Sequence, residues 1–234
     1  MDRDAPNPGA DDPRLRIVLL GTGTNVGKTW FGANLCRALR RHGAHCVALK
    51  PVESGWTPGS SDAELLAVAS GHSPPPSPYR FEPPISPHLA ARLSGRVLTA
   101  ELVRDHTLDA LRGMSCNASC FAVIETAGGL FSPLAPGVTN WDVARALDPA
   151  LWILVAPDSL GVLHDVTASL EAARARGRSP DFVALSAARP SDASTGTNSA
   201  ELTRLGIVTP AATLTRGDGD LSRFAAHLLE STRR

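Results

Sequence analysis

Short runs of apolar residues alternate along most of the chain with longer stretches in which apolar residues recur every three or four positions. Uninterrupted apolar runs are typical of strands buried on both faces, and the periodic stretches are typical of amphipathic helices. The predicted strands are 17–20, 46–49, 120–124, 151–155 and 182–185, with 207–208 as a weaker sixth. The predicted helices are 28–42, 62–70, 99–112, 162–176 and 221–230. This alternation predicts an α/β fold with a mostly parallel sheet and helices on both faces.

The length of the chain and the absence of an obvious linker favour one domain. A chain of 234 residues suits one large α/β domain, and no internal repeat is visible. The proline- and serine-rich segment 71–87 is predicted to be a surface loop rather than a linker. Residues 1–13 are acidic and rich in proline, so we expect a disordered lead-in, followed by a single domain over 14–234.

A glycine-rich turn joins the first predicted strand to the first predicted helix. It runs from Gly21 to Thr29 and ends in Gly27-Lys28-Thr29. Such a turn points backbone N–H groups at one spot, next to the positive end of the helix dipole. Lys28 can then reach the β- and γ-phosphates of a nucleotide, and the Thr29 hydroxyl can bind Mg²⁺. Five residues, rather than the usual four, separate Gly21 from Gly27, but the placement predicts a P-loop that binds nucleotide.

Two further strand ends carry residues suited to phosphate chemistry, because ligands of open parallel sheets bind beyond the carboxyl ends of the strands. Lys50 follows the second strand and is either a solvated lysine or a second cation for a transferring phosphoryl group. Glu125 ends the third strand and is either a surface acid or a holder of Mg²⁺. Asp62 begins a predicted helix, where on its own it is best explained as a cap or first-turn acid.

Composition narrows the class of protein. The net charge is +0 and only 5% of residues are aromatic, which argues against nucleic acid as a partner. The sequence contains no run of 18 apolar residues, which a membrane-spanning helix would need. We expect a cytoplasmic protein. Its four cysteines, Cys36, Cys46, Cys116 and Cys120, lack the spacing of a metal site and are expected to be buried or incidental thiols.

The order of the motifs resembles that of the dethiobiotin synthetase family from about residue 16 to residue 210. The motifs that carry the resemblance are Gly21–Thr29, Lys50–Gly55, Ser61-Asp62, Phe81–Leu89, Glu125–Leu130 and Leu160–Asp165. Several motifs in the same order are far more specific than a phosphate loop alone. The extra residue of the loop also resembles the family's version.

The resemblance implies a homodimeric enzyme with a P-loop ATPase fold that makes dethiobiotin for biotin biosynthesis. Its substrates are 7,8-diaminononanoate, CO₂ and ATP, with Mg²⁺ as cofactor. One amine of the substrate takes up CO₂ as a carbamate, and a carbamate oxygen attacks the γ-phosphate to give a carbamic–phosphoric anhydride. The second amine then closes the ureido ring, and phosphate and ADP are the other products.

The resemblance also assigns roles to residues of this chain. The catalytic group comprises Lys50 as the catalytic lysine, with Lys28, Thr24 and Ser54. The nucleotide-binding group comprises Asn25, Val26, Gly27, Lys28, Thr29, Trp30, Asp62, Glu125, Thr126, Ala127, Gly128, Ser186 and Ala187. The metal group comprises Thr29, Asp62 and Glu125. The substrate-binding group comprises Thr24, Lys50, Ser54, Gly161, Val162 and Leu163, the last three holding the distant carboxylate across the dimer interface.

The sequence departs from the family's pattern at several positions. Gly23 and Asn25 replace acidic residues of the loop, and His164-Asp165 replaces the Asn-His of the helix-start motif. Ser186-Ala187 replaces the Asn-Asp that contacts adenine, which predicts a weaker or different nucleobase selectivity. The alternative functions are a partition-type switch ATPase, whose signature lysine would occupy the position of Gly23, and a degenerate nucleotide-binding module.

Overall fold

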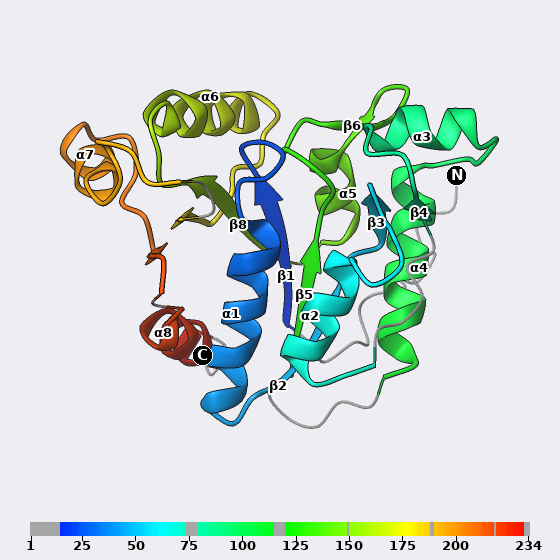
Figure 1. Cartoon of the computed structure of the whole chain (residues 1–234), viewed down its shortest axis with the longest axis horizontal. Helices are drawn as coiled ribbons and strands as arrows, with labels where there is room; N and C mark the ends of the chain where they lie inside the picture. The colour runs from blue at the N-terminus through cyan, green and yellow to red at the C-terminus, as the bar shows by residue number, and fades with distance from the viewer. Residues whose placement is uncertain are drawn as a thin grey trace.

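The computed structural model describes residues 15–73, 79–114, 120–148, 150–187, 190–217 and 219–231. Within these residues the main sheet has six strands in the order β10-β9-β8-β1-β5-β2, and every pair is parallel. The strands are β1 (Leu15–Gly21), β2 (His45–Leu49), β5 (Cys120–Glu125), β8 (Ala150–Pro157), β9 (Phe182–Ser186) and β10 (Ala212–Leu214). Figure 1 shows β1 near the middle of the molecule, with its carboxyl end leading into the loop that precedes α1 (Lys28–Arg41).

Strand β1 separates two hydrophobic cores because successive side chains of a strand point to opposite faces. Val18 and Leu20 belong to one core, Ile17 and Leu19 to the other, and all four side chains are fully buried. A strand that must bury both faces can carry no polar residue in its middle, which explains the uninterrupted apolar run.

Helices cover both faces, as predicted. The core around Ile17 and Leu19 includes side chains of α1, α2 (Asp62–Ser70) and α8 (Ser222–Ser231). The core around Val18 and Leu20 includes side chains of the remaining helices. These are α3 (Pro87–Leu93), α4 (Ala100–Arg112), α5 (Asn140–Ala146), α6 (Val162–Ala175) and α7 (Asn198–Arg204). No described helix has both the length and the apolar character that a membrane crossing requires.

Five of the predicted strands and all five predicted helices are confirmed, but the weak strand at 207–208 is wrong. The backbone N–H groups of Ile207 and Val208 both donate to the carbonyl of Leu202, so this segment closes the end of α7 instead of joining the sheet. Strand β10 takes the edge position.

Several short elements escaped prediction. Segment 71–87 is not a plain surface loop, since it contains β4 (Tyr79–Phe81), which pairs in parallel with β3 (Val52–Ser54), and the first residue of α3. The strands β6 (Pro133–Ala135) and β7 (Val138–Thr139) form a small antiparallel pair, and α5 and α7 were also missed. Strands of two or three residues are too short to show a period. The predicted lead-in 1–13 lies outside the described residues.

The cysteines fulfil the prediction in part. Cys36 and Cys46 are buried free thiols, as expected. Cys120 is disulfide-bonded, so the expectation of an incidental thiol is wrong at this position. That expectation followed from the presumed compartment, which sets an average redox state and not the geometry of one cysteine. Cys116 lies outside the described residues.

Candidate functional site

The sheet order brings the three chemically interesting strand ends together. Strand β5 lies between β1 and β2, with Glu125 paired to Leu19 and Ile124 paired to Leu49. Lys50, which directly follows β2, is therefore adjacent to Glu125 at the carboxyl edge of the sheet. The loop that follows β1 lies at the same edge, which confirms that these residues meet.

The loop at 21–29 is shaped by backbone conformations that few residues adopt. Gly27 has φ 90°, in the left-handed region that favours glycine. Asn25 has φ 56°, a value that asparagine tolerates better than most residues with a side chain. A Cβ at Gly21 would lie 2.9 Å from the carbonyl oxygen of Gly23, so the turn leaves no room for a side chain there. The turn is thus tight enough to bring successive backbone N–H groups close together.

Lys28 folds back over this loop. Its ammonium group donates to the carbonyl oxygen of Gly23 at 3.2 Å, and the residue is buried. Burial lowers the pKa of Lys28 to about 8, with Glu125 acting in the opposite direction and the charge of Lys50 lowering it further. The charged form of a buried lysine of this kind is stabilised strongly when an anion binds beside it.

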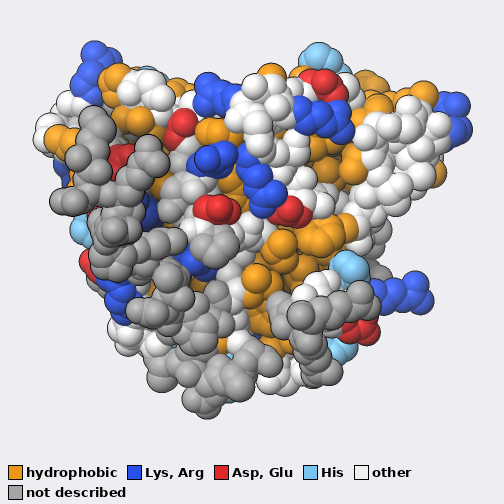
Figure 2. All heavy atoms as spheres, turned by 180° about the vertical axis from the view of Figure 1, so that it is seen from behind, with side chains coloured by type: hydrophobic (Ala, Val, Ile, Leu, Met, Phe, Trp, Pro, Cys, Tyr) orange, Lys and Arg blue, Asp and Glu red, His pale blue; other side chains and the backbone are white. Residues whose placement is uncertain are grey.

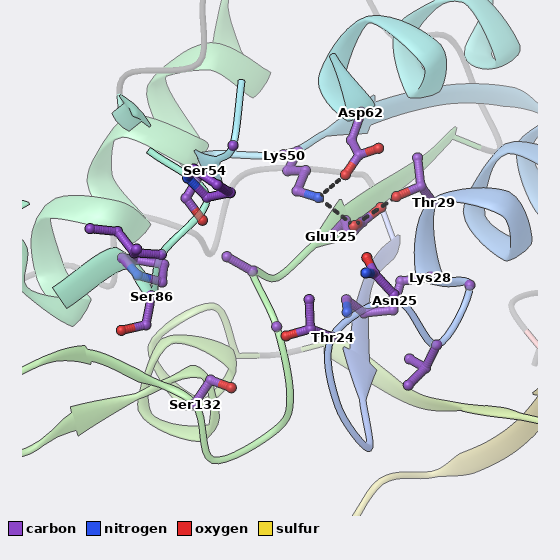
Figure 3. A pocket seen from close by; sticks show the side chains of 18 of the residues that line it. Thr24, Asn25, Lys28, Thr29, Lys50, Ser54, Asp62, Ser86, Glu125 and Ser132 are labelled. Carbon is purple, nitrogen blue, oxygen red and sulfur yellow. Dashed lines mark hydrogen bonds and ion pairs between the residues drawn. The ribbon is translucent and has the colours of Figure 1, made fainter. Parts of the chain in front are cut away.

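Lys50 lies between two carboxylates (Figure 3). Its ammonium group donates to Oδ2 of Asp62 and, at 2.7 Å, to Oε1 of Glu125. The side chains of Lys50 and Glu125 are 9% and 1% exposed, whereas that of Asp62 is 42% exposed. Burial on its own lowers the pKa of Lys50, but the two carboxylates outweigh it and hold that pKa above its usual value. Lys50 is therefore fully charged, and the interpretation as a solvated lysine is wrong.

The oxygen atoms around Glu125 fit a divalent cation. The Thr29 hydroxyl donates to Oε1 of Glu125 at 3.0 Å, and Asp62 is joined to the same group through Lys50. Oε2 of Glu125 is buried and has no hydrogen-bond partner among the described residues. Carboxylate and hydroxyl oxygens are the ligands that Mg²⁺ prefers, and a buried carboxylate oxygen without a partner is costly unless a ligand or water satisfies it. The three predicted metal-binding residues therefore suit Mg²⁺.

These groups face one cavity of about 710 Å³ (Figure 3). The predicted site residues that line it are Thr24, Asn25, Val26, Gly27, Lys28, Thr29, Trp30, Lys50, Ser54, Asp62, Glu125, Ala127 and Gly128. Figure 3 shows Lys50, Asp62 and Glu125 close together in this lining, and the hydroxyl groups of Thr24 and Ser54 add to its polar part.

Other predicted residues lie outside this cavity. Thr126 donates from its hydroxyl group to the carbonyl of Leu19 at 2.9 Å, so its side chain ties β5 to β1. Ser186 is fully buried at the end of β9, and the N–H of Ala187 donates to the carbonyl of Leu214. The segment 161–163 begins α6, on the far side of β1 from Lys50. Their assigned roles stay predictions.

The cavity also has walls that sequence reasoning did not find. The missed lining residues are Gly55, Pro84, Ile85, Ser86, Pro87 and Ser132. The N–H of Gly55 donates to the carbonyl of Pro83 at 3.1 Å, which holds the proline-rich segment against the end of β3. The motif Phe81–Leu89 was visible in the sequence and could have indicated this wall, whereas nothing in the sequence marked Ser132.

Comparison with known proteins agrees with this geometry. Residues 15–217 match a family described as an AAA domain. The ATP-dependent dethiobiotin synthetase BioD of Anaeromyxobacter dehalogenans (strain 2CP-1) is 36% identical over 217 residues, which cover 91% of this chain and 94% of the relative. The chain belongs to the dethiobiotin synthetase family. The BioD protein of Corynebacterium diphtheriae is 32% identical over 210 residues, covering 89% of this chain and 92% of its own. The resemblance seen in the motifs is therefore confirmed.

Solved structures confirm the fold alone. The signal recognition particle receptor FtsY of Elizabethkingia anophelis has a TM-score of 0.56 at 14% identity, covering 99% of this chain and 68% of its own. A ParA family ATPase of Chlorobium tepidum has a TM-score of 0.52 at 13% identity, covering 95% and 99%. These likenesses confirm the predicted P-loop architecture of this dethiobiotin synthetase family member. Identities this low carry no statement about activity.

Proposed function

We propose that this chain is an ATP-dependent dethiobiotin synthetase, a cyclo-ligase that forms carbon–nitrogen bonds. It converts 7,8-diaminononanoate, CO₂ and ATP into dethiobiotin, ADP and phosphate. The observation that carries the proposal is one cavity that joins the phosphate loop, two lysines and two acids to a set of hydroxyl groups, in a chain that belongs to this family.

The phosphate end of the cavity suits a nucleoside triphosphate. The loop at 21–29 presents backbone N–H groups beside the start of α1, and Lys28 supplies a cation among them. Thr29, Asp62 and Glu125 would hold Mg²⁺, which supplies positive charge for the phosphate oxygens when it is bound. ATP is therefore held beside the charged groups of the cavity.

The space beside the phosphate loop suits a small diamine. The hydroxyl groups of Thr24 and Ser54 can accept hydrogen bonds from substrate amines, and the segment at 84–87 limits the width of the space. The carbamate formed on one amine would lie between this wall and the γ-phosphate. Its attack forms an oxygen–phosphorus bond and releases ADP.

Lys50 supports this step because its charge is permanent and faces the cavity. Negative charge develops on the transferring phosphoryl group and on the carbamate oxygen, and a fixed cation lowers the energy of that charge. The second amine then attacks the carbamate carbon, the carbon–oxygen bond to phosphate breaks, and the ring closes.

The finer assignments belong to the same proposal. Residues 161–163, at the start of the 14-residue helix α6, would bind the substrate carboxylate in a homodimer, since anions are stabilised at a helix N-terminus. Leu160, directly before them, is strongly exposed. Figure 2 shows a band of hydrophobic side chains on the face opposite to that of Figure 1, and an exposed apolar surface is one feature of faces that pair with another chain. A cytoplasmic location accords with this biosynthetic role.

The test is ATP-dependent incorporation of labelled bicarbonate into an acid-stable product in the presence of diaminononanoate. We expect incorporation that matches ADP release mole for mole. Hydrolysis of ATP without incorporation would indicate a switch ATPase, and nucleotide binding without turnover would indicate a degenerate binding module. Either result would overturn the proposal.

A further inference from the structure

Glu53 is a buried acid close to the cavity that has no role in the chemistry described above. It lies in β3, three positions after Lys50, and is 4% exposed. Its Oε1 accepts a hydrogen bond from the backbone N–H of Asp62 at 2.6 Å, and its Oε2 accepts one from the Ser61 hydroxyl at 2.9 Å. Both donors belong to the start of α2, and Glu53 does not line the cavity.

These bonds fix the first residues of α2. Free backbone N–H groups at a helix N-terminus need acceptors, and a carboxylate there is also favoured by the helix dipole. The Ser61 hydroxyl accepts from the N–H of Glu64 at 3.3 Å while it donates to Glu53. The cap of α2 is thus itself held in place by Glu53.

The contacts form a closed ring with the catalytic lysine. The side chain of Asp62 accepts from Lys50, and the backbone of Asp62 donates to Glu53. Lys50 and Glu53 belong to one short segment, which is held in turn by the parallel pairing of β3 with β4. Because the side chain of Asp62 is 42% exposed, close packing does not orient it. Its direction depends on the bond from Lys50 and on the position of its own backbone.

We infer that Glu53 is a positioning residue that aims Asp62 at Lys50 and at the proposed Mg²⁺ site through the start of α2. The inference rests on the proposed function, in which these two residues take part. What matters is the reach of the side chain to two donors, rather than its negative charge alone.

The substitutions Glu53→Gln and Glu53→Asp separate the effect of side-chain length from the effect of negative charge. In Glu53→Gln the side-chain oxygen can still accept from the Asp62 N–H, but the amide nitrogen can only donate, so the Ser61 hydroxyl proton loses its acceptor. Glu53→Asp keeps the charge but is one methylene shorter, so it cannot reach both donors. Glu64→Ala is the matched control, because it removes an acid from the same first turn of α2 while the backbone N–H that bonds Ser61 remains.

The experiment measures Mg²⁺-dependent binding of a nonhydrolysable ATP analogue by calorimetry, together with kcat and KM for ring closure. In Glu53→Asp we expect the Mg²⁺ concentration for half-maximal binding to rise and kcat to fall, each by about 10- to 100-fold, as is usual when a partner that orients a metal ligand is lost. Glu53→Gln is expected to lose clearly less than Glu53→Asp on both readouts, because it keeps the bond to the Asp62 N–H. Glu64→Ala is expected to stay within about threefold of the unmodified chain, which is little beside such losses.

The reverse ranking, with Glu53→Asp near normal and Glu53→Gln impaired, would overturn the inference, because charge would then be what matters. An equal effect of all three substitutions would overturn it as well. If the unmodified chain binds Mg²⁺ and nucleotide but closes no ring, the proposed function fails. The ranking of the binding constants still decides the role of Glu53.

Discussion

The Nζ atom of Lys50 lies 2.7 Å from Oε1 of Glu125, and both side chains are almost completely buried. A buried pair of this kind is costly to break from one side, because the remaining charge loses its partner. The pair also keeps the lysine charged and restricts its orientation at the edge of the cavity. Substitutions at either residue are therefore informative about chemistry and metal binding.

Replacement of Lys50 by glutamine is expected to lower kcat for ring closure by at least about 10²- to 10³-fold, the usual cost of losing one group that stabilises transition-state charge. Nucleotide binding should change little, because in the proposed function Lys28 and the loop backbone, and not Lys50, hold the phosphates. Steady-state turnover and calorimetric titration with ADP measure the two effects. Loss of ADP binding with normal residual chemistry would show that the role of Lys50 is misassigned.

Replacement of Glu125 by glutamine removes a charge from the proposed metal site while it keeps the size of the side chain. We expect the Mg²⁺ concentration for half-maximal activity to rise at least about tenfold, since carboxylate charge dominates Mg²⁺ binding. Titration of activity with Mg²⁺ at saturating ATP measures the change. Glu64→Gln is a suitable control, because it makes the same change of charge at an acid in the first turn of α2 that does not line the cavity. An unchanged Mg²⁺ requirement in the Glu125 variant would remove Glu125 from the metal site.

Nucleotide binding is expected to take up a proton at pH values above about 8. The pKa of Lys28 is lowered to about 8 in the free protein, chiefly by burial, and a bound polyphosphate favours the charged form and raises that pKa. Affinity for ATP should therefore decrease as pH rises through 8. Calorimetry at pH 8.5 in buffers of different ionisation enthalpy measures the uptake. It should disappear in Lys28→Arg, which stays charged.

The same pKa shift predicts the sign of a stability effect in the free protein. The unfolded chain keeps the Lys28 proton up to a pKa of about 10.5, whereas the folded chain loses it near 8. Between these values the unfolded state binds more protons, so the contribution of Lys28 to the free energy of unfolding rises with pH. Denaturant unfolding of the unmodified chain and of Lys28→Met between pH 7.5 and 10 tests this. A difference between the two that does not vary with pH would contradict it.

Selectivity among nucleobases is expected to be weak or altered. Ser186 and Ala187 carry neither the amide nor the carboxylate that the family resemblance predicts for the adenine contact at these positions, and Ser186 is fully buried. Without such hydrogen bonds, discrimination among ATP, CTP, GTP and UTP should stay below about 10²-fold in kcat/KM. A steep preference for ATP over all three would remove the hypothesis.

The sequence pattern predicted the strands of the main sheet whose two faces are both buried. The apolar run at 17–20 was recognisable because β1 lies in the middle of the sheet, where the side chains on both faces are buried. The pair Ile207-Val208 shows the limit of that reasoning, since apolar residues can also close the end of a helix. The short strands β3 and β4 left no periodic signal at all.

For the site, position at a strand end was the useful signal. It located Lys50 and Glu125, while the resemblance added Asp62, whose structural role in the first turn of α2 is equally real. Ser132 and the segment 84–87 were missed because loops carry no period, and their approach to the cavity depends on contacts such as the one between Gly55 and Pro83. The function of Glu53 could not be read from sequence, because its two donors lie eight and nine positions away.

The strand order affects how the chain folds as it is synthesised. Strand β5 is inserted between β1 and β2 but is made after both, and the contacts that join Glu125 to Lys50 and Thr29 span 75 and 96 positions of chain. Contacts of such sequence separation form slowly, because a long loop must close before they stabilise anything. A nascent chain that ends before β5 lacks the acid that pairs with Lys50. The proposed Mg²⁺ and nucleotide site therefore requires β5 to be in place between β1 and β2.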